Sequence, residues 1–392
     1  MISHYFKIAI RNLCKYKTQN AISIIGLSVG LLCFCICMYC SRFVDSTNHC
    51  FSNYERIAEL SLYDSKADRY FSGTPVPLSE ELRTWSMGEV EAISCVTYPR
   101  ERPFYVEVSS EKTLPYELET IEADTCYNRV FTPKMVAGHW EMASRSLNSA
   151  ILSQSIAIKI FGNAESAIGK HMTLMRRLNT SPESTPRTGG IVYTIQAVME
   201  DIPLNNSIDF MQNIDVLTVN DSEGLLQSPK RHNMTGASTY ALLSPPITCA
   251  TLEKQFSKRN YTYTLYNEAY TITADRMGTQ LKKQGASYLA LVTGTIGTLI
   301  LLVGLINFFH FLIGSFFNRT KEYSIMKMAG CNWKQLFSLL FTQSLIIISI
   351  SSVLVLWGIE LVGGHMDFSL PGFAMTFTAK ALLIHALQYI IS

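Results

Sequence analysis

The stretch that first suggests chemistry is FGNAESAIGK, residues 161–170, which ends in Gly-Lys after an earlier glycine. A phosphate-binding P-loop has four residues between its two glycines and a Ser or Thr after its lysine. The backbone N–H groups surround the phosphates and the hydroxyl holds Mg²⁺. Here six residues separate Gly162 from Gly169, and His171 follows Lys170. We therefore interpret Gly162 as the stop of a short helix, with Gly169 and Lys170 in the turn into a strand.

A search for catalytic groups finds no clear set of a nucleophile, a base and an orienting acid. Four histidines lie between the first two apolar runs without a His-x-x-x-His metal spacing: His49, His139, His171 and His232. The sequence therefore predicts a protein that is not an enzyme and that carries no cofactor or metal.

Four of the ten cysteines fall in one apolar run, at Cys33, Cys35, Cys37 and Cys40. In a helix, side chains two residues apart point about 200° away from each other, so the four cysteines cannot share one face. We interpret them as small apolar residues rather than metal ligands. The spacing of four others leaves disulfide pairing open; these are Cys50, Cys95, Cys126 and Cys249.

Long apolar runs lie near the two ends of the chain, and only 16% of its 392 residues are charged. Both features are typical of a membrane protein. Three runs are as long as the roughly 20 residues that cross a bilayer as a helix. We predict a first span at residues 21–43 and two more within residues 287–361. Residues 362–378 are expected to form an extracytoplasmic loop, and residues 379–392 to begin a fourth span that the end of the chain truncates.

Positive charges predict the orientation of these spans, because short segments rich in Lys and Arg stay in the cytoplasm. One such segment is residues 1–20, where an apolar stripe and a basic stripe alternate at helical spacing, which predicts an amphipathic helix on the membrane surface. The other is the link 318–335. Residues 44–286 then lie outside the cytoplasm. The lipid membrane is therefore one partner, whereas nucleic acid is not expected because the basic clusters lie beside the spans.

Residues 44–286 combine helix-like segments, such as PVPLSEELRTW, with strand-like ones, such as FYVEVSS and GIVYTIQAVME. The polar run NTSPESTPRTGG predicts a loop between two strands. The predicted fold class is an α-helical transmembrane bundle of three full spans and a partial fourth, with a large α+β extracytoplasmic domain inserted between spans 1 and 2.

Three blocks of the sequence, in order, resemble the MacB/FtsX-type permeases of ABC transporters. The first is YFKIAIRNLCKYKTQNAISIIGLSVGL, a basic helix that runs into a span with glycines at 26 and 30. The second comprises VFTPKMVAGHW, AILSQSIAIKIFGNAESAIGK and YTIQAVMEDIPLNNSIDF, which are similar to the MacB-like core domain. The third is LINFFHFLIGSFFNRTKEYSIMKMAGCNWKQLFSLLFTQSL, similar to the second and third spans with their link.

The resemblance implies a permease in the bacterial inner membrane, with a cytoplasmic N-terminus, that does not hydrolyse ATP itself. A partner ABC ATPase would supply the energy for export or mechanotransmission, and two permease units would act as a dimer or pseudo-dimer. The family usually has a complete fourth span, and its large members carry a second copy of the unit. Gln343 stands where Glu is common in the family.

The candidate site is the link between the second and third spans, where aromatic and Met side chains lie among charges, as at protein interfaces. With the resemblance, this predicts that the link docks an ATPase through Arg319, Lys321, Glu322, Tyr323, Met326, Lys327 and Trp333. The alternative is an ordinary basic loop that faces the cytoplasm. Polar residues within the spans are Asn307, His310 and Gln343. Asn307 and His310 are expected to form hydrogen bonds between helices. Gly294, Gly297 and Gly304 are expected to pack against a neighbouring helix.

A different class of function fits the same sequence: a sensory or scaffold membrane protein whose outer domain binds an extracytoplasmic partner, such as a cell-wall hydrolase, without transport.

Overall fold

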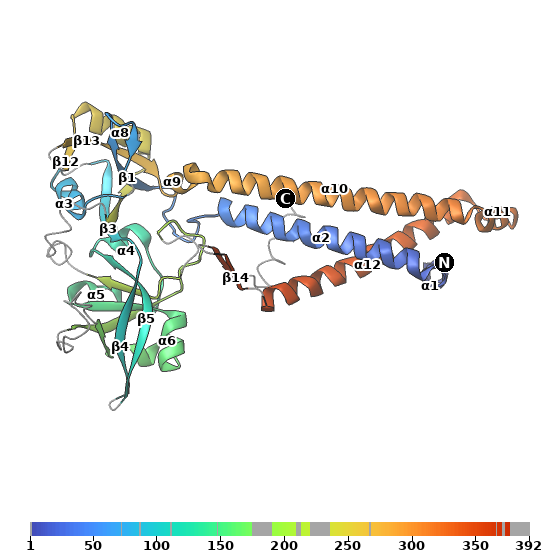
Figure 1. The fold of residues 1–392 in the computed structure, drawn as a ribbon, viewed down its shortest axis with the longest axis horizontal. Coiled ribbons are helices and arrows are strands. Elements are labelled where there is room, and N and C mark those ends of the chain that lie inside the picture. The colour runs from blue at the N-terminus through green and yellow to red at the C-terminus, as the bar shows by residue number, and fades with distance from the viewer. Residues whose placement is uncertain are drawn as a thin grey trace, which may run out of the picture. The chain divides into compact units, whose positions relative to one another are not determined.

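The computed structural model describes residues 2–376 apart from 72, 86–87, 110–111, 147, 175–189, 209–212, 220–235, 266–267, 366 and 371–372 (Figure 1). The chain divides into two compact units, one of Met1–Asp45 with Gly285–Ser392 and one of Ser46–Gln284. We call them the helical unit and the inserted domain. The predicted start of a fourth span, residues 379–392, lies outside the described residues.

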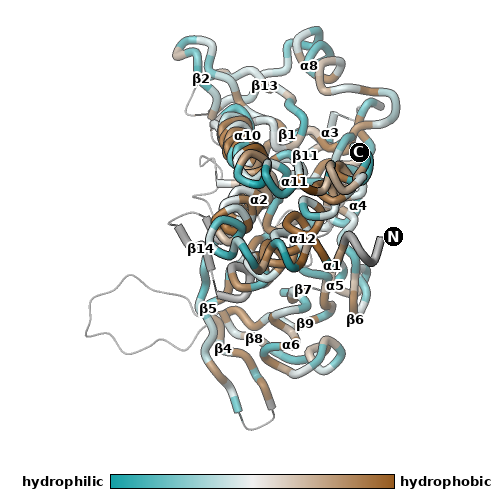
Figure 2. Tube along the Cα trace, turned by 90° about the vertical axis from the view of Figure 1, so that its right-hand side faces the viewer, coloured by the Kyte–Doolittle hydropathy of each residue, from teal (hydrophilic) through white to brown (hydrophobic). Residues whose placement is uncertain are grey.

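Among the described residues of the helical unit, three helices are long and apolar enough to cross a membrane, and Figure 2 shows hydrophobic residues along each. They are α2 (Lys17–Asp45), α10 (Ser287–Asn318) and α12 (Trp333–His365). Two shorter helices accompany them, α1 (Ile2–Lys15) and α11 (Thr320–Met328). The segment expected to be a loop after the third span contains a hairpin of β14 (Asp367–Leu370) and β15 (Phe373–Thr376).

The amphipathic segment at the N-terminus is shorter than the sequence suggests, since α1 ends at Lys15 and α2 already begins at Lys17. The break leaves the carbonyl of Leu13 without a helical partner, and the side-chain amide of Asn20 donates to it at 3.0 Å. Leu13 packs against a cluster formed by Leu27, Phe308 and Ile347. The polar residues after Lys17 therefore start the first span rather than continue the surface helix.

Helices α2 and α10 approach closely along a seam of small residues. A Cβ placed on Gly30 would lie 3.5 Å from the Cα of Gly304, and one on Gly297 would lie 2.6 Å from the Cβ of Cys37. Small residues allow two helix backbones to come near enough for extensive van der Waals contact, which is what holds helices together in lipid. This is the packing role that the sequence predicts for the glycines of the second span.

The seam yields a direct test of helix packing. A Cβ on Gly294 would lie 3.7 Å from the Cβ of Ser41, within the range of roughly 3.5–4.5 Å that a disulfide requires. We expect a Ser41→Cys/Gly294→Cys variant, made without the native cysteines, to form an intramolecular disulfide that changes its electrophoretic mobility upon mild oxidation.

The control pairs Ser41→Cys with Gly314→Cys, because a Cβ at Gly314 would have no neighbour within 4 Å. Equal oxidation of the two pairs would rule out the observed seam.

The sequence GLSVG, residues 26–30, has the Gly-x-Ser-x-Gly spacing of a hydrolase nucleophile elbow. In the structure Ser28 lies within α2 rather than at a strand-to-helix turn. Its hydroxyl donates to the carbonyl of Ile24 at 2.6 Å, and the hydroxyl of Ser351 on α12 donates to the same carbonyl at 3.2 Å. The motif therefore joins two helices and has no catalytic geometry.

The inserted domain is built on a mixed sheet in the order β10-β7-β9-β8-β4-β5-β3-β11-β1-β13-β12, with β2 beside β1 and β6 beside β9. Because β10 also pairs with β5, the strands from β10 to β5 form a closed ring. The bounds are β1 (Ile57–Asp64), β2 (Arg69–Tyr70), β3 (Val90–Thr97), β4 (Arg100–Ser109), β5 (Lys112–Ala123), β6 (Met135–Gly138), β7 (Ser149–Ser153), β8 (His171–Leu174), β9 (Ile191–Met199), β10 (Val216–Val219), β11 (Ala237–Leu243), β12 (Thr262–Leu265) and β13 (Glu268–Arg276).

Helices cover this sheet around three large apolar cores, with a small fourth one at Val76, Cys95 and Ala237. The ring encloses one core with α6 (Gln154–Phe161), and a second lies where α3 (Val76–Thr84) and α8 (Cys249–Lys258) cover β1, β11 and β13. The third contains α4 (Tyr127–Phe131) and α5 (Trp140–Arg145), with Phe51 packed edge-on against Phe131. The fold class predicted from the sequence is confirmed: three long apolar helices and a large α+β domain between the first and second.

The stretch 161–170 has the geometry of a structural turn. Helix α6 ends at Phe161, and Gly162 follows with φ +85°, a left-handed conformation that favours glycine. Gly169 has φ +79°, and its N–H donates to the carbonyl of Ile195 at 2.8 Å just before β8 begins. The chain thus runs from helix to strand, which is the reverse of the strand-to-helix order of a P-loop.

Candidate functional site at the link between α10 and α12

The link is a helix with two defined ends rather than an open loop. Helix α11 stops because Gly330 has φ +92°, so that its N–H bonds to the carbonyl of Lys327 and the N–H of Cys331 bonds to that of Met326. This pair of bonds is the Schellman motif. At the start of α12, the Gln335 side chain accepts from the N–H of Asn332 at 3.0 Å, which is one of the two bonds of a capping box. The Asn332 side chain accepts from the N–H of Trp333, the first residue of α12, at 2.8 Å.

Arg319, which precedes α11, is buried inside the helical unit with 2% of its surface exposed. Its guanidinium donates to the Oε1 atom of Gln343 on α12 at 3.0 Å, in a buried contact. The same guanidinium lies 4.3 Å from the ring centroid of Tyr16, between α1 and α2. A buried guanidinium requires such partners because it cannot lose its charge. Arg319 therefore ties four helices together at this end of the unit.

Glu322 holds α1 against α11. It accepts a hydrogen bond from the ammonium of Lys15 at 2.6 Å and one from the hydroxyl of Tyr16 at 3.3 Å. The hydrogen bond between the two charges lowers the pKa of Glu322 and raises the pKa of Lys15. Because this pair lies at the surface, it contributes little to stability, and it joins α1 to α11.

The structure divides the predicted docking residues into two groups. Tyr323 is 5% exposed and stacks on Phe316 at 5.4 Å between ring centroids, so it belongs to the interior, as Arg319 does. The prediction that these two residues contact a partner is therefore corrected. Both are buried, because Arg319 is bound by Gln343 and the Tyr16 ring, and Tyr323 packs on Phe316. Glu322 is engaged with α1.

The outward face of the link carries the other predicted residues. Lys321 and Lys327 are exposed, Trp333 is 62% exposed, and the ammonium of Lys327 lies 4.8 Å from the Trp333 ring centroid. A shallow pocket lined by Met326, Lys327, Trp333 and neighbouring residues lies beside them.

Two further exposed apolar residues of α11 lie with Lys321 on a different side of the helix, and neither is among the residues predicted from the sequence. They are Ile325, 62% exposed, and Met328, 81% exposed. A spacing of three residues places Ile325 and Met328 on the same side of a helix. The sequence alone does not show that this side is the exposed one. We call this surface around α11 the link face: the exposed Lys321, Ile325, Lys327, Met328 and Trp333, with the half-buried Met326.

The polar residues of the spans lie in different surroundings. Gln343 is 3% exposed and accepts the bond from Arg319. The side-chain nitrogen of Asn307 would lie 2.8 Å from a Cβ placed on Gly26, so the glycine makes room for the amide. His310 is exposed on α10, one turn further along.

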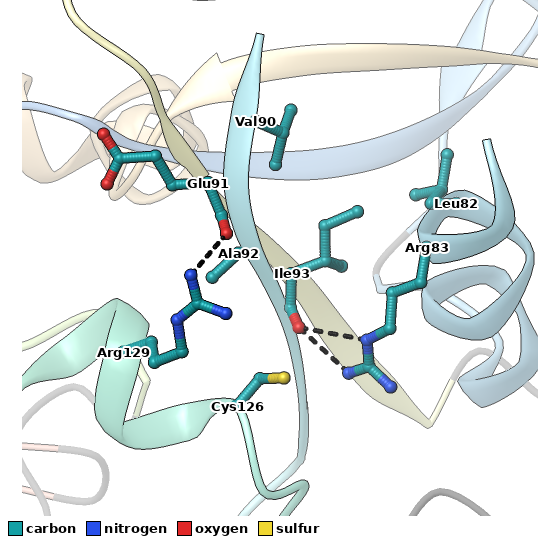
Figure 3. Close-up of a pocket in the computed structure, with 8 residues that line it drawn as sticks. All are labelled: Leu82, Arg83, Val90, Glu91, Ala92, Ile93, Cys126 and Arg129. Carbon is teal, nitrogen blue, oxygen red and sulfur yellow. Dashed lines mark hydrogen bonds between the residues drawn. The ribbon is translucent and has the colours of Figure 1, made fainter. Parts of the chain in front are cut away.

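The inserted domain has a cavity of about 210 Å³ beside β3, flanked by Arg83 and Arg129. Figure 3 shows both guanidinium groups directed at backbone carbonyls of this strand, Arg83 at Ile93 and Arg129 at Glu91. Arg83 also pairs with Asp124. Since their hydrogen bonds go to the fold itself, this arrangement supports the strand and does not offer a free anion site.

Comparisons with known proteins agree with the arrangement of the helical unit. Residues 294–392 match the family model described as "FtsX-like permease C-terminal". No curated protein matches the chain.

Solved structures resemble the chain distantly. A putative permease domain from Porphyromonas gingivalis has 20% sequence identity and a TM-score of 0.43, with 58% of this chain and 93% of that one covered. The periplasmic region of MacB from Actinobacillus actinomycetemcomitans has 11% identity and a TM-score of 0.38, with 60% and 94% covered. The extracellular domain of the noncanonic ABC-type transporter YknZ from Gram-positive bacteria has 12% identity and a TM-score of 0.32, with 52% and 87% covered. The chain is therefore a multi-pass membrane protein whose residues 294–392 are similar to the FtsX-like permease C-terminal family.

Proposed function

We propose that this chain is the permease subunit of an ABC transporter and that it couples ATP hydrolysis by a partner ATPase to movement of the inserted domain. The observation that carries the proposal is the link face, where exposed apolar side chains stand among lysines at the end of the unit that matches the FtsX-like family. An exposed apolar cluster with a charged rim is the composition of a protein interface.

The interior of the link supports transmission of force. A push on α11 reaches Arg319 at its start, and Arg319 contacts both Gln343 on α12 and Tyr16 at the junction of α1 and α2. Helix α2 is in turn packed against α10 through Gly30 and Gly304. Because packed interiors deform little, displacement of α11 would move the ends of several helices together. Two of these, α2 and α10, are continuous in the chain with the inserted domain.

The orientation and assembly follow the same proposal. The link and the N-terminus would face the cytoplasm of a bacterium, since both carry the clustered lysines and arginines, and the inserted domain would lie beyond the inner membrane. We further propose that two permease units assemble side by side. His310 is exposed on α10, and a polar side chain within a span favours contact with another helix over contact with lipid.

The test is purification of the full natural chain in detergent from its own membranes, with measurement of the ATPase activity that accompanies it. We expect the ATPase activity that co-purifies with an Ile325→Ser/Met328→Ser variant to be at least about tenfold lower than with the wild type. Loss of a central apolar contact typically weakens binding by about 2 kcal/mol or more, and each 1.4 kcal/mol is a factor of ten. Tyr323 is left intact, since its removal would also disturb the interior.

The matched control is Val136→Ser/Met142→Ser, which removes two apolar side chains of the inserted domain that are 45% and 54% exposed. It should retain the ATPase. If the wild type retains no ATPase under conditions that preserve other membrane complexes, the transport proposal fails and a sensory or scaffold role takes its place.

A further inference from the structure

We propose that the inserted domain binds a small organic amine in a cavity that contains the carboxylate of Glu59. The cavity has a volume of about 270 Å³, and its lining includes Glu59, Ser61, Tyr70, Phe71, Tyr98 and Ser207. This is close to the lower end of the range for small-molecule sites, roughly 300 Å³, so the ligand would be about the size of one ring with a short side chain. We call it the Glu59 cavity.

The carboxylate is placed in the cavity by the sheet. Glu59 lies on β1 opposite Tyr240 of β11 and Asp275 of β13. Its Oε2 atom accepts one long hydrogen bond, 3.4 Å, from the N–H of Gly278. Among the described residues, no Lys or Arg forms an ion pair with it. Burial, with a contribution from Asp275, raises the pKa of Glu59 to about 7. A bound cation would offset this cost of desolvation.

A second polar atom in the same cavity also has an open bonding position. The hydroxyl of Ser207 is buried and has no hydrogen-bond partner within the part of the chain that the structure describes. The backbone of Ser207 is fixed, because its N–H donates to the side chain of Asn48 at 2.8 Å, and Asn48 in turn donates to the carbonyl of Met277 at 3.3 Å. A hydroxyl held in place beside a carboxylate suits the several N–H donors of an ammonium group.

The rings of the cavity already attract cations from the protein. The ammonium of Lys283 lies 5.6 Å from the ring centroid of Tyr70 and 2.9 Å from an oxygen of Asp275. The fold thus satisfies one ammonium with a carboxylate and an aromatic face. Arg69 likewise lies 5.6 Å from the ring centroid of Phe71. Glu59 shares the cavity with these rings, but among the described residues neither cation forms an ion pair with its carboxylate.

The chemistry of the lining favours an amine over a metal ion. Ca²⁺ and Mg²⁺ take six or more oxygen ligands, commonly from several carboxylates, whereas one carboxylate with hydroxyls matches a single ammonium. No group of three or more metal-ligating His, Cys, Asp or Glu side chains occurs among the described residues. Phe71, Ile208 and Leu281 provide apolar contact for the body of the ligand.

The cavity predicts a pH dependence for binding. The groups that face Glu59 from the surrounding elements are Tyr70, Tyr98, Tyr240, Asp275 and Lys283. Asp275 and Lys283 neutralise each other. With the pKa of Glu59 at about 7, its ionised fraction rises about tenfold between pH 6 and pH 8, and the apparent affinity for a cation should rise by the same factor.

The experiment measures binding of benzylamine to the full chain in detergent by isothermal titration calorimetry at pH 6 and pH 8, without any ATPase. Benzyl alcohol, which has the same shape but no charge, serves as the neutral probe. We expect benzylamine to bind about tenfold more tightly at pH 8 and benzyl alcohol not to bind measurably. Glu59→Gln should lose the binding, and Ser207→Ala should weaken it, whereas the exposed Glu165→Gln should leave it unchanged.

A thermal melt of each variant shows whether the domain is folded. If Glu59→Gln does not fold, the proposal is tested by the binding of benzylamine to Ser207→Ala. Equal binding by wild type and Glu59→Gln, equal binding of the alcohol, or no binding at millimolar benzylamine would each overturn the proposal. The result does not depend on the ATPase test, so the two proposals can fail separately.

Discussion

Replacing Arg83 by Met is expected to lower the free energy of unfolding of the inserted domain by about 3 kcal/mol, the low end of the range for breaking a buried ion pair. Asp124 is 1% exposed and accepts bonds from the Ser94 hydroxyl at 3.0 Å and the Cys95 N–H at 2.7 Å. Arg83 supplies its balancing charge. Without the guanidinium, a carboxylate would remain buried and unpaired. The low end applies because the Arg83 side chain is 26% exposed, so water partly replaces it.

The measurement is urea denaturation of the full chain followed by tryptophan fluorescence, since Trp85 and Trp140 lie in this domain. Arg100→Met, which removes an exposed arginine of β4, is the control and should change stability by less than about 0.5 kcal/mol. Adding Asp124→Asn to Arg83→Met should recover part of the loss, because the neutral amide removes the unpaired charge. If Arg83→Met and Arg100→Met are equally stable, the pair does not stabilise the fold.

The second large effect is expected at Gln343, whose replacement by Leu should lower the thermal midpoint of the helical unit by about 3–12 °C. Leu is apolar and of similar size, so the loss is that of the acceptor for the buried Arg319 guanidinium. A hydrogen bond to a charged group contributes about 1.5–3 kcal/mol, and each kcal/mol moves the midpoint of a unit of this size by roughly 2–4 °C.

The informative partner variant is Gln343→Glu, which keeps the acceptor and adds a charge opposite to that of Arg319. It should melt at or above the wild-type temperature, and both midpoints are followed by circular dichroism in detergent. Under the proposed function, Gln343→Leu should also reduce ATPase retention, because α11 loses its anchor to α12. If Gln343→Leu has the same thermal midpoint as the wild type, Arg319 has another hydrogen-bond partner in the variant.

Features governed by local chemistry were predictable from the sequence. The spans followed from runs of apolar residues, because a bilayer requires a length and a composition that a window of sequence contains. The turn at Gly162 and Gly169 followed from spacing and helix-stop chemistry, and the positive φ at both agrees with it. Helix contact at Gly304 was likewise predictable, since a small residue in a span has few other uses.

The tertiary structure alone decided which residues of the link face inward. Arg319 and Lys321 are the same kind of residue in the sequence, yet one is buried against Gln343 and the other is exposed, because long-range contacts with Tyr16 and α12 fix the rotation of α11. The Glu59 cavity also has no signature in the sequence. Its walls come from residues between Glu59 and Leu281 that only the pairing of β1 with β11 and β13 brings together. Sequence patterns predict structure that depends on residues close together in the chain. Contacts between residues distant in the sequence depend on how the whole fold packs.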